Sequence, residues 1–141
     1  MATFQHSISV GYSVTDTTAP GAGALSRSAF LGRQSDGNKQ FEVTVPAGAT
    51  NQAVAINFSH TNLKSVYLAV TDGAGAGTVT VKTNSSGSPD NTFTVKSNGP
   101  LVWNADMPLA NPFTAAVTGG LYISNAGAKD VTVTGLVLED V

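Results

Sequence analysis

The residues of this chain whose types could do chemistry are few and lie far apart. Among its 141 residues there are two histidines, His6 and His60, nine acidic residues and no cysteine. The absence of cysteine excludes thiol catalysis and iron–sulfur clusters. Neither histidine has the ligand spacing of a metal motif, and no G-x-S-x-G motif is present. We therefore predict no enzyme activity, no catalytic residue, no metal ligand and no cofactor.

The acidic residues are mostly isolated, and their positions predict structural or solvated roles. Glu139 and Asp140 are adjacent, and adjacent strand residues point to opposite faces, so we expect a solvated end and no catalytic pair. Asp72, Asp90, Asp106 and Asp130 all lie in predicted loops, where carboxylates can converge on calcium. The D-x-D-x-D-G pattern is missing, and a loop calcium site is left open.

The motif DGAGAG at 72–77 is the one stretch that could suggest a phosphate site. A dinucleotide fingerprint has the spacing G-x-G-x-x-G and opens a helix after a strand. Here Gly73, Gly75 and Gly77 give G-x-G-x-G, and the TVTVKT that follows is typical of a strand. The sequence therefore predicts that these glycines form a hairpin loop and bind no ligand.

The elements that would position these residues are predicted by alternation of apolar and polar residues. In FQHSISVGYSV at 4–14 the even positions, other than His6, are apolar, which is typical of a half-buried strand. No sustained 3.6-residue pattern is present, so no long helix is expected. The same period of two indicates further strands around Phe41–Val45, Val54–Phe58, Val66–Val70, Val79–Val81, Phe93–Val95, Leu101–Trp103, Leu121–Ile123 and Val131–Leu138.

Two features refine this pattern of strands. Near the last strand the apolar positions change from odd, at Val131 and Val133, to even, at Leu136 and Leu138. Gly135 lies at the change, which predicts a β-bulge there. Trp103 is in phase with Leu101, so we expect a core residue in place of a sugar-stacking platform.

Turn-forming residues separate the predicted strands, for example SDGN at 35–38 and SNGP at 97–100. Short strands joined by such turns predict an all-β fold, an antiparallel two-sheet sandwich, for which we prefer a jelly roll. Residues 1–141 are expected to form one domain. Residues 1–3 and the loop 15–26 are predicted to be a docking arm or loop, and 104–116 is a second long loop.

Composition excludes several classes of partner. Charged residues make up 11% of the chain and the net charge is −2, compared with roughly 25% charged residues in typical globular domains. The seven basic residues are scattered, so no stripe suited to nucleic acid is expected. No apolar run reaches the ~20 residues that a membrane helix needs. Without a recognisable secretion signal, synthesis in the cytoplasm is expected.

The second part of the chain resembles a known family by its overall arrangement. The segments VPAGATN, TNSSGSPDNTFTVKSNGPLVWN and LYISNAGAKDVTVTGLVLEDV resemble the head decoration, or cement, proteins of tailed bacteriophages. The resemblance covers roughly residues 40 to 141. It implies a β-sandwich on the exterior of the virion capsid that bridges major capsid protein subunits, as a dimer or trimer, and stabilises the shell.

Residues that would contact such a partner are selected by exposure and by lack of strand pattern. Tyr67 and Tyr122 lie in the outward phase of their strands, as interface residues do. The expected partner interface comprises Phe4, Thr17, Thr18, Pro20, Leu25, Tyr67 and Tyr122. The alternatives are a carbohydrate- or receptor-binding β-sandwich module of a phage tail or fibre, and a hydrolase on a β scaffold. The former class usually shows several exposed aromatic residues, and here aromatic residues are 7%.

Overall fold

The computed structural model describes residues 3–14, 25–72 and 76–141, and for 10–14, 25–28 and 33 it describes the backbone only. All regular structure in this part of the chain is β-strand, and within it no helix could cross a membrane. The strands are β1 (Phe4–Val14), β2 (Leu25–Ser35), β3 (Gly37–Val45), β4 (Gln52–Val54), β5 (Leu63–Thr71), β6 (Thr78–Thr83), β7 (Thr92–Lys96), β8 (Leu101–Asn104), β9 (Leu121–Ser124) and β10 (Val131–Glu139).

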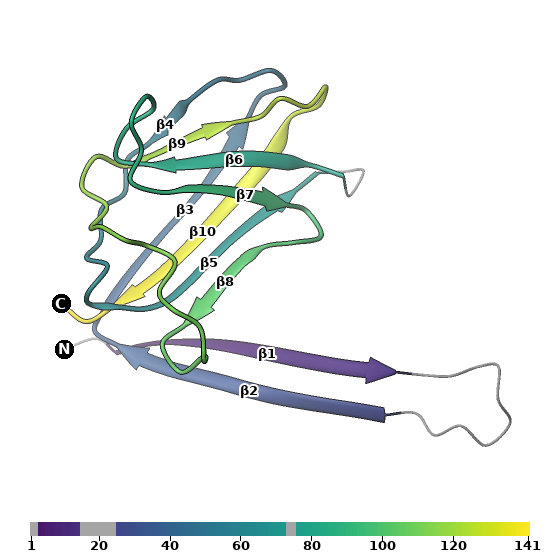
Figure 1. Ribbon diagram of the computed structural model, residues 1–141, viewed down its shortest axis with the longest axis vertical. Helices are drawn as coiled ribbons and strands as arrows, with labels where there is room; N and C mark the ends of the chain where they lie inside the picture. The colour runs from purple at the N-terminus through teal and green to yellow at the C-terminus, as the bar shows by residue number, and fades with distance from the viewer. Residues whose placement is uncertain (1–2, 15–24, 73–75) are drawn as a thin grey trace, which may run out of the picture.

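Eight of the strands form two four-stranded sheets that pack face to face (Figure 1). The strand orders are β3-β10-β5-β8 and β4-β9-β6-β7, and every neighbouring pair is antiparallel. The order is nested, because β6 pairs with β7, β5 with β8, β4 with β9 and β3 with β10. The antiparallel sandwich that the alternation predicted is confirmed.

The core lies between the two sheets and is built mainly from valine. β-Branched side chains fit a pleated, half-buried surface, which is why these sequences form strands. Three rings from different parts of the chain meet edge to face, with centroids 5.0 Å apart for Phe58 and Phe113 and 5.1 Å apart for Phe93 and Phe113. Trp103 is buried as expected, and its indole N–H donates to the Leu109 carbonyl at 3.1 Å.

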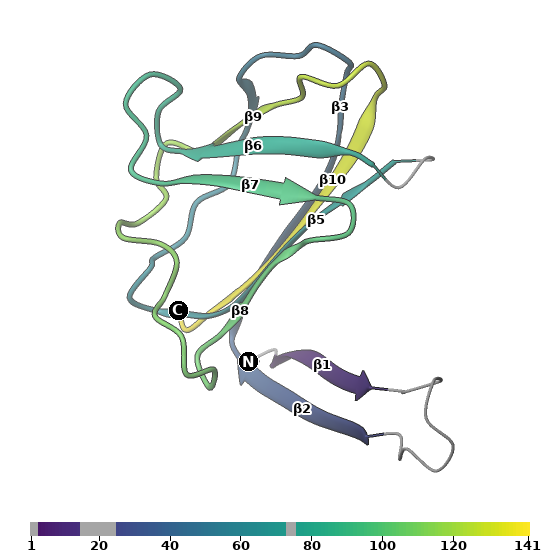
Figure 2. The ribbon, with the colours of Figure 1, turned by 45° about the vertical axis from the view of Figure 1, so that its right-hand side comes forward.

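The first two strands leave the sandwich as a long hairpin, which we call the arm (Figures 1 and 2). Eleven residue pairs join β1 and β2, from Phe4 opposite Ser35 to Val14 opposite Leu25. The strand at 4–14 is confirmed, but Phe4 remains 38% exposed because the arm pairs with neither large sheet. SDGN is not a reversing turn, since β2 passes into β3 through a single bend at Asp36.

Strand β2 was not predicted. Leu25 and Ser26, assigned to a loop, belong to β2, while 15–24 lie outside the described residues. Phe30 falls in the opposite phase to Leu31, and Arg27 and Arg33 occupy positions in phase with Leu25, Ala29 and Leu31. The alternation is therefore broken, and pairing with β1 supplies the strand conformation that local pattern does not indicate.

The predicted bulge at Gly135 is wrong. β10 runs through Gly135 in continuous register with both neighbours, opposite Phe41 and Leu68, and its register with β5 shifts only between Leu138 and Glu139. The odd residues of β10 face the core throughout. Leu136 and Leu138 belong to the outer face of β10, where the base of the arm lies. Near its end, β10 therefore carries apolar side chains on both faces, and Leu138 is fully buried.

The prediction of a hairpin loop for DGAGAG is also wrong in one respect. β5 and β6, which flank it, belong to different sheets, so the segment connects the two layers of the sandwich. Residues 73–75 lie outside the described residues. Of the rest, the Asp72 carboxylate accepts a hydrogen bond from Ala76 N at 3.0 Å, and a Cβ on Gly77 would touch Val131 and Val70. A strand, not a helix, follows the glycines.

Gly135 allows close packing of an aromatic ring, and this generates a prediction. A Cβ added there would lie 2.1 Å from the Phe41 ring, so we expect Gly135→Val to lower the free energy of unfolding by about 1–3 kcal/mol through overpacking. Urea unfolding measures the change. Gly87→Ala is the control, because nothing lies within 4 Å of its Cβ position.

A second variant separates this explanation from a general intolerance of side chains in β10. Phe41→Leu in the Gly135→Val background shrinks the ring that causes the clash, so the double variant should be less destabilised than the sum of the two single variants. Simple additivity would contradict the proposed clash between residue 135 and Phe41.

Candidate functional site

The residues expected at a partner interface are divided among three places. Phe4, at the base of the arm, and Tyr67, on the outer face of β5, lie on the arm side of the molecule. Tyr122 is on the outer face of the other sheet. Leu25 is at the start of β2, where only the backbone is described, and Thr17, Thr18 and Pro20 lie outside the described residues.

The histidines are separated and do not form a site with the acids. His6 Nε2 lies 3.1 Å from Asn38 Oδ1, which joins β1 to β3. His60 accepts a hydrogen bond at its carbonyl from Asn111 Nδ2 at 2.7 Å, and its Nδ1 is buried without a partner. Across residues 3–14, 25–72 and 76–141, no group of three or more histidine, aspartate or glutamate residues is placed to hold a metal ion.

The loop carboxylates that could have converged on calcium instead hold loops in place one by one. Asp130 Oδ1 accepts from Ala47 N at 2.9 Å, and Asp90 accepts from the Asn84 side chain. Asn84 also accepts from Thr118 N at 2.8 Å. These contacts order the connections of the sandwich by satisfying backbone groups that strands leave unpaired.

The arm is seated on the outer face of the sheet β3-β10-β5-β8. β2 lies against β10 and β5, and residues 5–8 of β1 line a hollow together with Ser65, Tyr67 and Leu136. Leu138 and Ser65 face each other across the strands and are 0% and 1% exposed. This buried contact outside the main core fixes the base of the arm.

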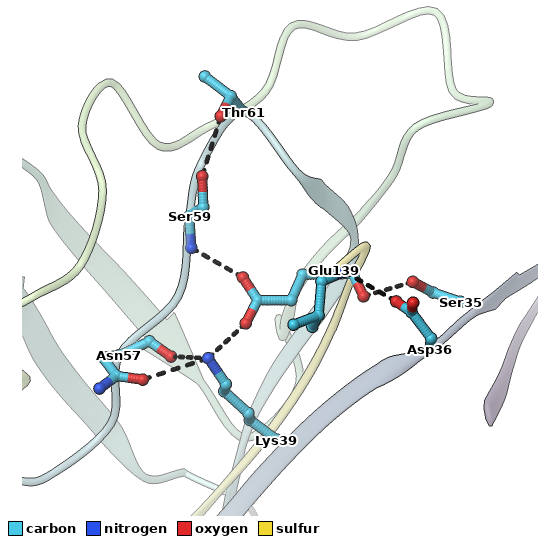
Figure 3. A network of polar contacts seen from close by, with 8 residues as sticks. Ser35, Asp36, Lys39, Asn57, Ser59, Thr61 and Glu139 are labelled. Carbon is cyan, nitrogen blue, oxygen red and sulfur yellow. Dashed lines mark hydrogen bonds and ion pairs between the residues drawn. The ribbon is translucent and has the colours of Figure 1, made fainter. Parts of the chain in front are cut away.

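A polar cluster that includes the ion pair of Lys39 with Glu139 (Figure 3) and that of Lys64 with Asp140 lies next to the base of the arm. Glu139, expected to be solvated, is only 4% exposed. One of its carboxylate oxygens pairs with Lys39 Nζ, and the other accepts from Ser59 N at 2.8 Å. Lys39 Nζ also donates to the Asn57 carbonyl at 2.7 Å. The buried Glu139 carboxylate is thereby paired and hydrogen bonded, as its burial requires, while Lys39 stays partly exposed.

The same cluster ties residues 139–141 to the junction of the arm and the sandwich. Ser35 Oγ donates to the Glu139 carbonyl, and the Asp36 carboxylate accepts from Val141 N at 2.7 Å. A Cβ on Gly37 would lie 2.8 Å from the backbone oxygen of Glu139, so this close approach requires glycine. Asp140 pairs with Lys64 Nζ at 2.9 Å. The residues before and after the bend at Asp36 therefore both contact residues 139–141.

No local signal in the sequence could have identified this cluster. Lys39 and Glu139 are separated by most of the chain and meet because β3 and β10 are neighbours in the sheet. The adjacent groove is lined by three amide side chains together with Lys39, Thr118, small residues and Ile56, and no aromatic side chain lines it. The cluster is suited to holding the arm in place, since its charges are occupied by one another.

Comparison with known proteins gave no relative. No protein-family model, no curated protein and no solved structure matches the chain.

The polar cluster generates a stability prediction. In Glu139→Gln the amide would place an N–H group toward Lys39 or lose the bond from Ser59 N, so we expect a loss of about 1–3 kcal/mol in the free energy of unfolding. Thermal and urea unfolding measure it. The control is Glu42→Gln on an exposed part of β3, for which a change within about 0.5 kcal/mol is expected. Equal effects of the two substitutions would contradict a structural role for the buried Glu139 carboxylate.

Proposed function

We propose that this chain is a virion structural protein, a decoration or cement protein that binds the outside of a tailed-phage head. In this proposal it bridges subunits of the major capsid protein and stabilises the shell. The observation that carries the proposal is the arm, a hairpin of eleven residue pairs that extends from a rigid sandwich without joining either of its sheets. Such an element has the form needed to reach a neighbouring subunit.

The attachment of the arm supports a mechanical role. β2 continues into β3 through one bend, and that bend is held by the contacts of Ser35 and Asp36 with residues 139–141. β3 in turn pairs with β10 along its full length. A force applied to the arm is therefore passed to backbone hydrogen bonds of the sheet, which is what bridging of capsid subunits requires.

The distribution of charge is consistent with a large contact. The strand at 4–14 contains no lysine, arginine, aspartate or glutamate. Burying this strand therefore carries no cost of desolvating a lysine, arginine or carboxylate. Binding to heads is therefore expected to depend only weakly on salt.

The nested strand order supports assignment of the sandwich to the jelly rolls, a class found among viral capsid proteins. In that assignment β3 to β10 are the eight strands, and each connection except β6 to β7 crosses between the sheets. The alternative, a carbohydrate-binding module, has less support, because the amide-lined groove beside β3 has no aromatic surface on which a sugar ring could stack.

Of the expected interface residues, Phe4 and Tyr67 are favoured for the contact with the shell. Both lie on the arm side, whereas Tyr122 belongs to the other sheet and would face away if the arm lies on the capsid. The protein would be synthesised in the host cytoplasm and act on the capsid exterior.

A shortened arm tests the proposed function. Residues 10–29 are replaced by Asn-Gly, a two-residue turn that suits a hairpin, so that the paired residues Ser9 and Phe30 become its ends. The base of the arm and the sandwich keep their contacts. We expect occupancy on assembled heads of the phage that carries the gene to fall by at least about tenfold, since the far part of the arm, which would reach the neighbouring subunit, is lost while Phe4 and Tyr67 are kept.

Tyr122→Ala is the matched control on the opposite sheet and should leave occupancy unchanged. Both variants are first checked for an unchanged melting midpoint of the sandwich. Full occupancy by the shortened protein would move the contact away from the arm. Failure of the intact protein to bind heads would remove the cement function and direct attention to a receptor-binding role.

A further inference from the structure

The outer edges of both arm strands lack a strand partner in the described part of the chain. β1 pairs with β2, and their sheet contains no third strand. A two-stranded hairpin alone is marginally stable in water, and stability needs further strands or a packed face. Residues 5–8, near the base of β1, line the hollow against the sandwich, and the C-terminal end of the β1 ribbon lies away from both large sheets (Figures 1 and 2).

The other edges in the molecule carry features that prevent pairing with a foreign strand. Proteins protect exposed edges by charge, proline, bulges or short length. β4 and β8 have three and four residues. β3 carries Lys39 and Glu42, and β7 ends at Lys96. β2 carries Arg27 and Arg33. β1 has eleven residues without proline or a formally charged residue, and its register with β2 has no bulge.

The sequence of β1 is complementary to itself in an antiparallel arrangement. With a two-fold axis at Ser9, Ile8 would lie opposite Val10, His6 opposite Tyr12 and Phe4 opposite Val14. Serine, glutamine and glycine would then occupy the other face. An axis at position 10 or 11 preserves the same separation of apolar and polar residues, because the strand period is two.

We propose that two copies of this chain associate through the outer edges of their β1 strands. The two strands would be antiparallel, and the two-fold axis would pass at residue 9, 10 or 11. The two arms would form one four-stranded sheet in the order β2-β1-β1-β2. This arrangement closes the unprotected edge and forms a symmetric, self-limiting contact. It leaves the arginine-bearing β2 strands at the outside. The pairing does not depend on the proposed function.

Position-specific cross-linking tests the pairing, and the absence of native cysteine makes it direct. Five single-cysteine variants are oxidised separately: Ser7→Cys, Ser9→Cys, Val10→Cys, Gly11→Cys and Ser13→Cys. A disulfide requires Cα atoms within about 7 Å, and in an antiparallel pair only a residue at the axis meets its own copy. We expect one of positions 9, 10 and 11 to cross-link, and positions 7 and 13 to remain uncross-linked.

A charge variant tests the same contact without a cross-linker. Ser9→Lys would place two ammonium groups near the axis, so we expect the dimer dissociation constant, measured by sedimentation equilibrium, to rise by at least about tenfold. Ser28→Lys makes the same change on β2 and should leave the constant unchanged. An unchanged circular dichroism spectrum and melting midpoint confirm folding of each variant.

Three results would overturn the pairing. They are a monomer at all concentrations, a trimer, and a dimer that Ser9→Lys does not weaken. A monomer that still binds heads would overturn the pairing and leave the proposed function standing. A dimer that does not bind heads would support the pairing and overturn the proposed function.

Discussion

Hydrogen bonding of β10 on both of its edges is the constraint on which the rest of the structure depends. β3 and β5 pair with it from Val131 to Glu139, so the last strand lies in the interior of its sheet. Its odd residues face the core, and on its outer face Leu136 lines the hollow at the base of the arm. The sheet and the seat of the arm are therefore completed by the same nine residues, and these pairings are almost all between distant parts of the chain.

Placement of the few charges follows from that constraint. Where β10 ends beside β3, the Glu139 side chain is buried and Lys39 lies next to it and forms an ion pair. A buried carboxylate without a partner would be costly, and the bonds from Lys39 and Ser59 N offset that cost. Charged residues are only 11% of the chain, so few ions need such compensation. With so few charged residues, a large protein contact could form without burying unpaired charges.

The arm and the sandwich are joined by a single bend residue and its hydrogen bonds instead of by a linker. The bend at Asp36 is one residue long and is held by Ser35, Asp36 and Gly37 against residues 139–141. A flexible connection would lose conformational entropy whenever the arm bound a partner. An arm already fixed in direction avoids much of that cost. Its unprotected β1 edge is therefore presented in a defined orientation, which favours one pairing geometry over many.

The sequence by itself determined the all-β class, most of the sandwich strands and the burial of Trp103, because a period of two directly reflects one buried face. It also indicated the strand at 4–14, but not that this strand leaves the sandwich, since alternation shows that a face is covered without showing by what. Only the tertiary structure decided the strand state of 25–35, the continuous register through Gly135 and the pairing of Lys39 with Glu139. Each of these depends on a partner far away in the chain. The change of phase after Val133 had two physical solutions, a bulge or burial on both faces, and the choice was made by the arm packed against the outer side of β10.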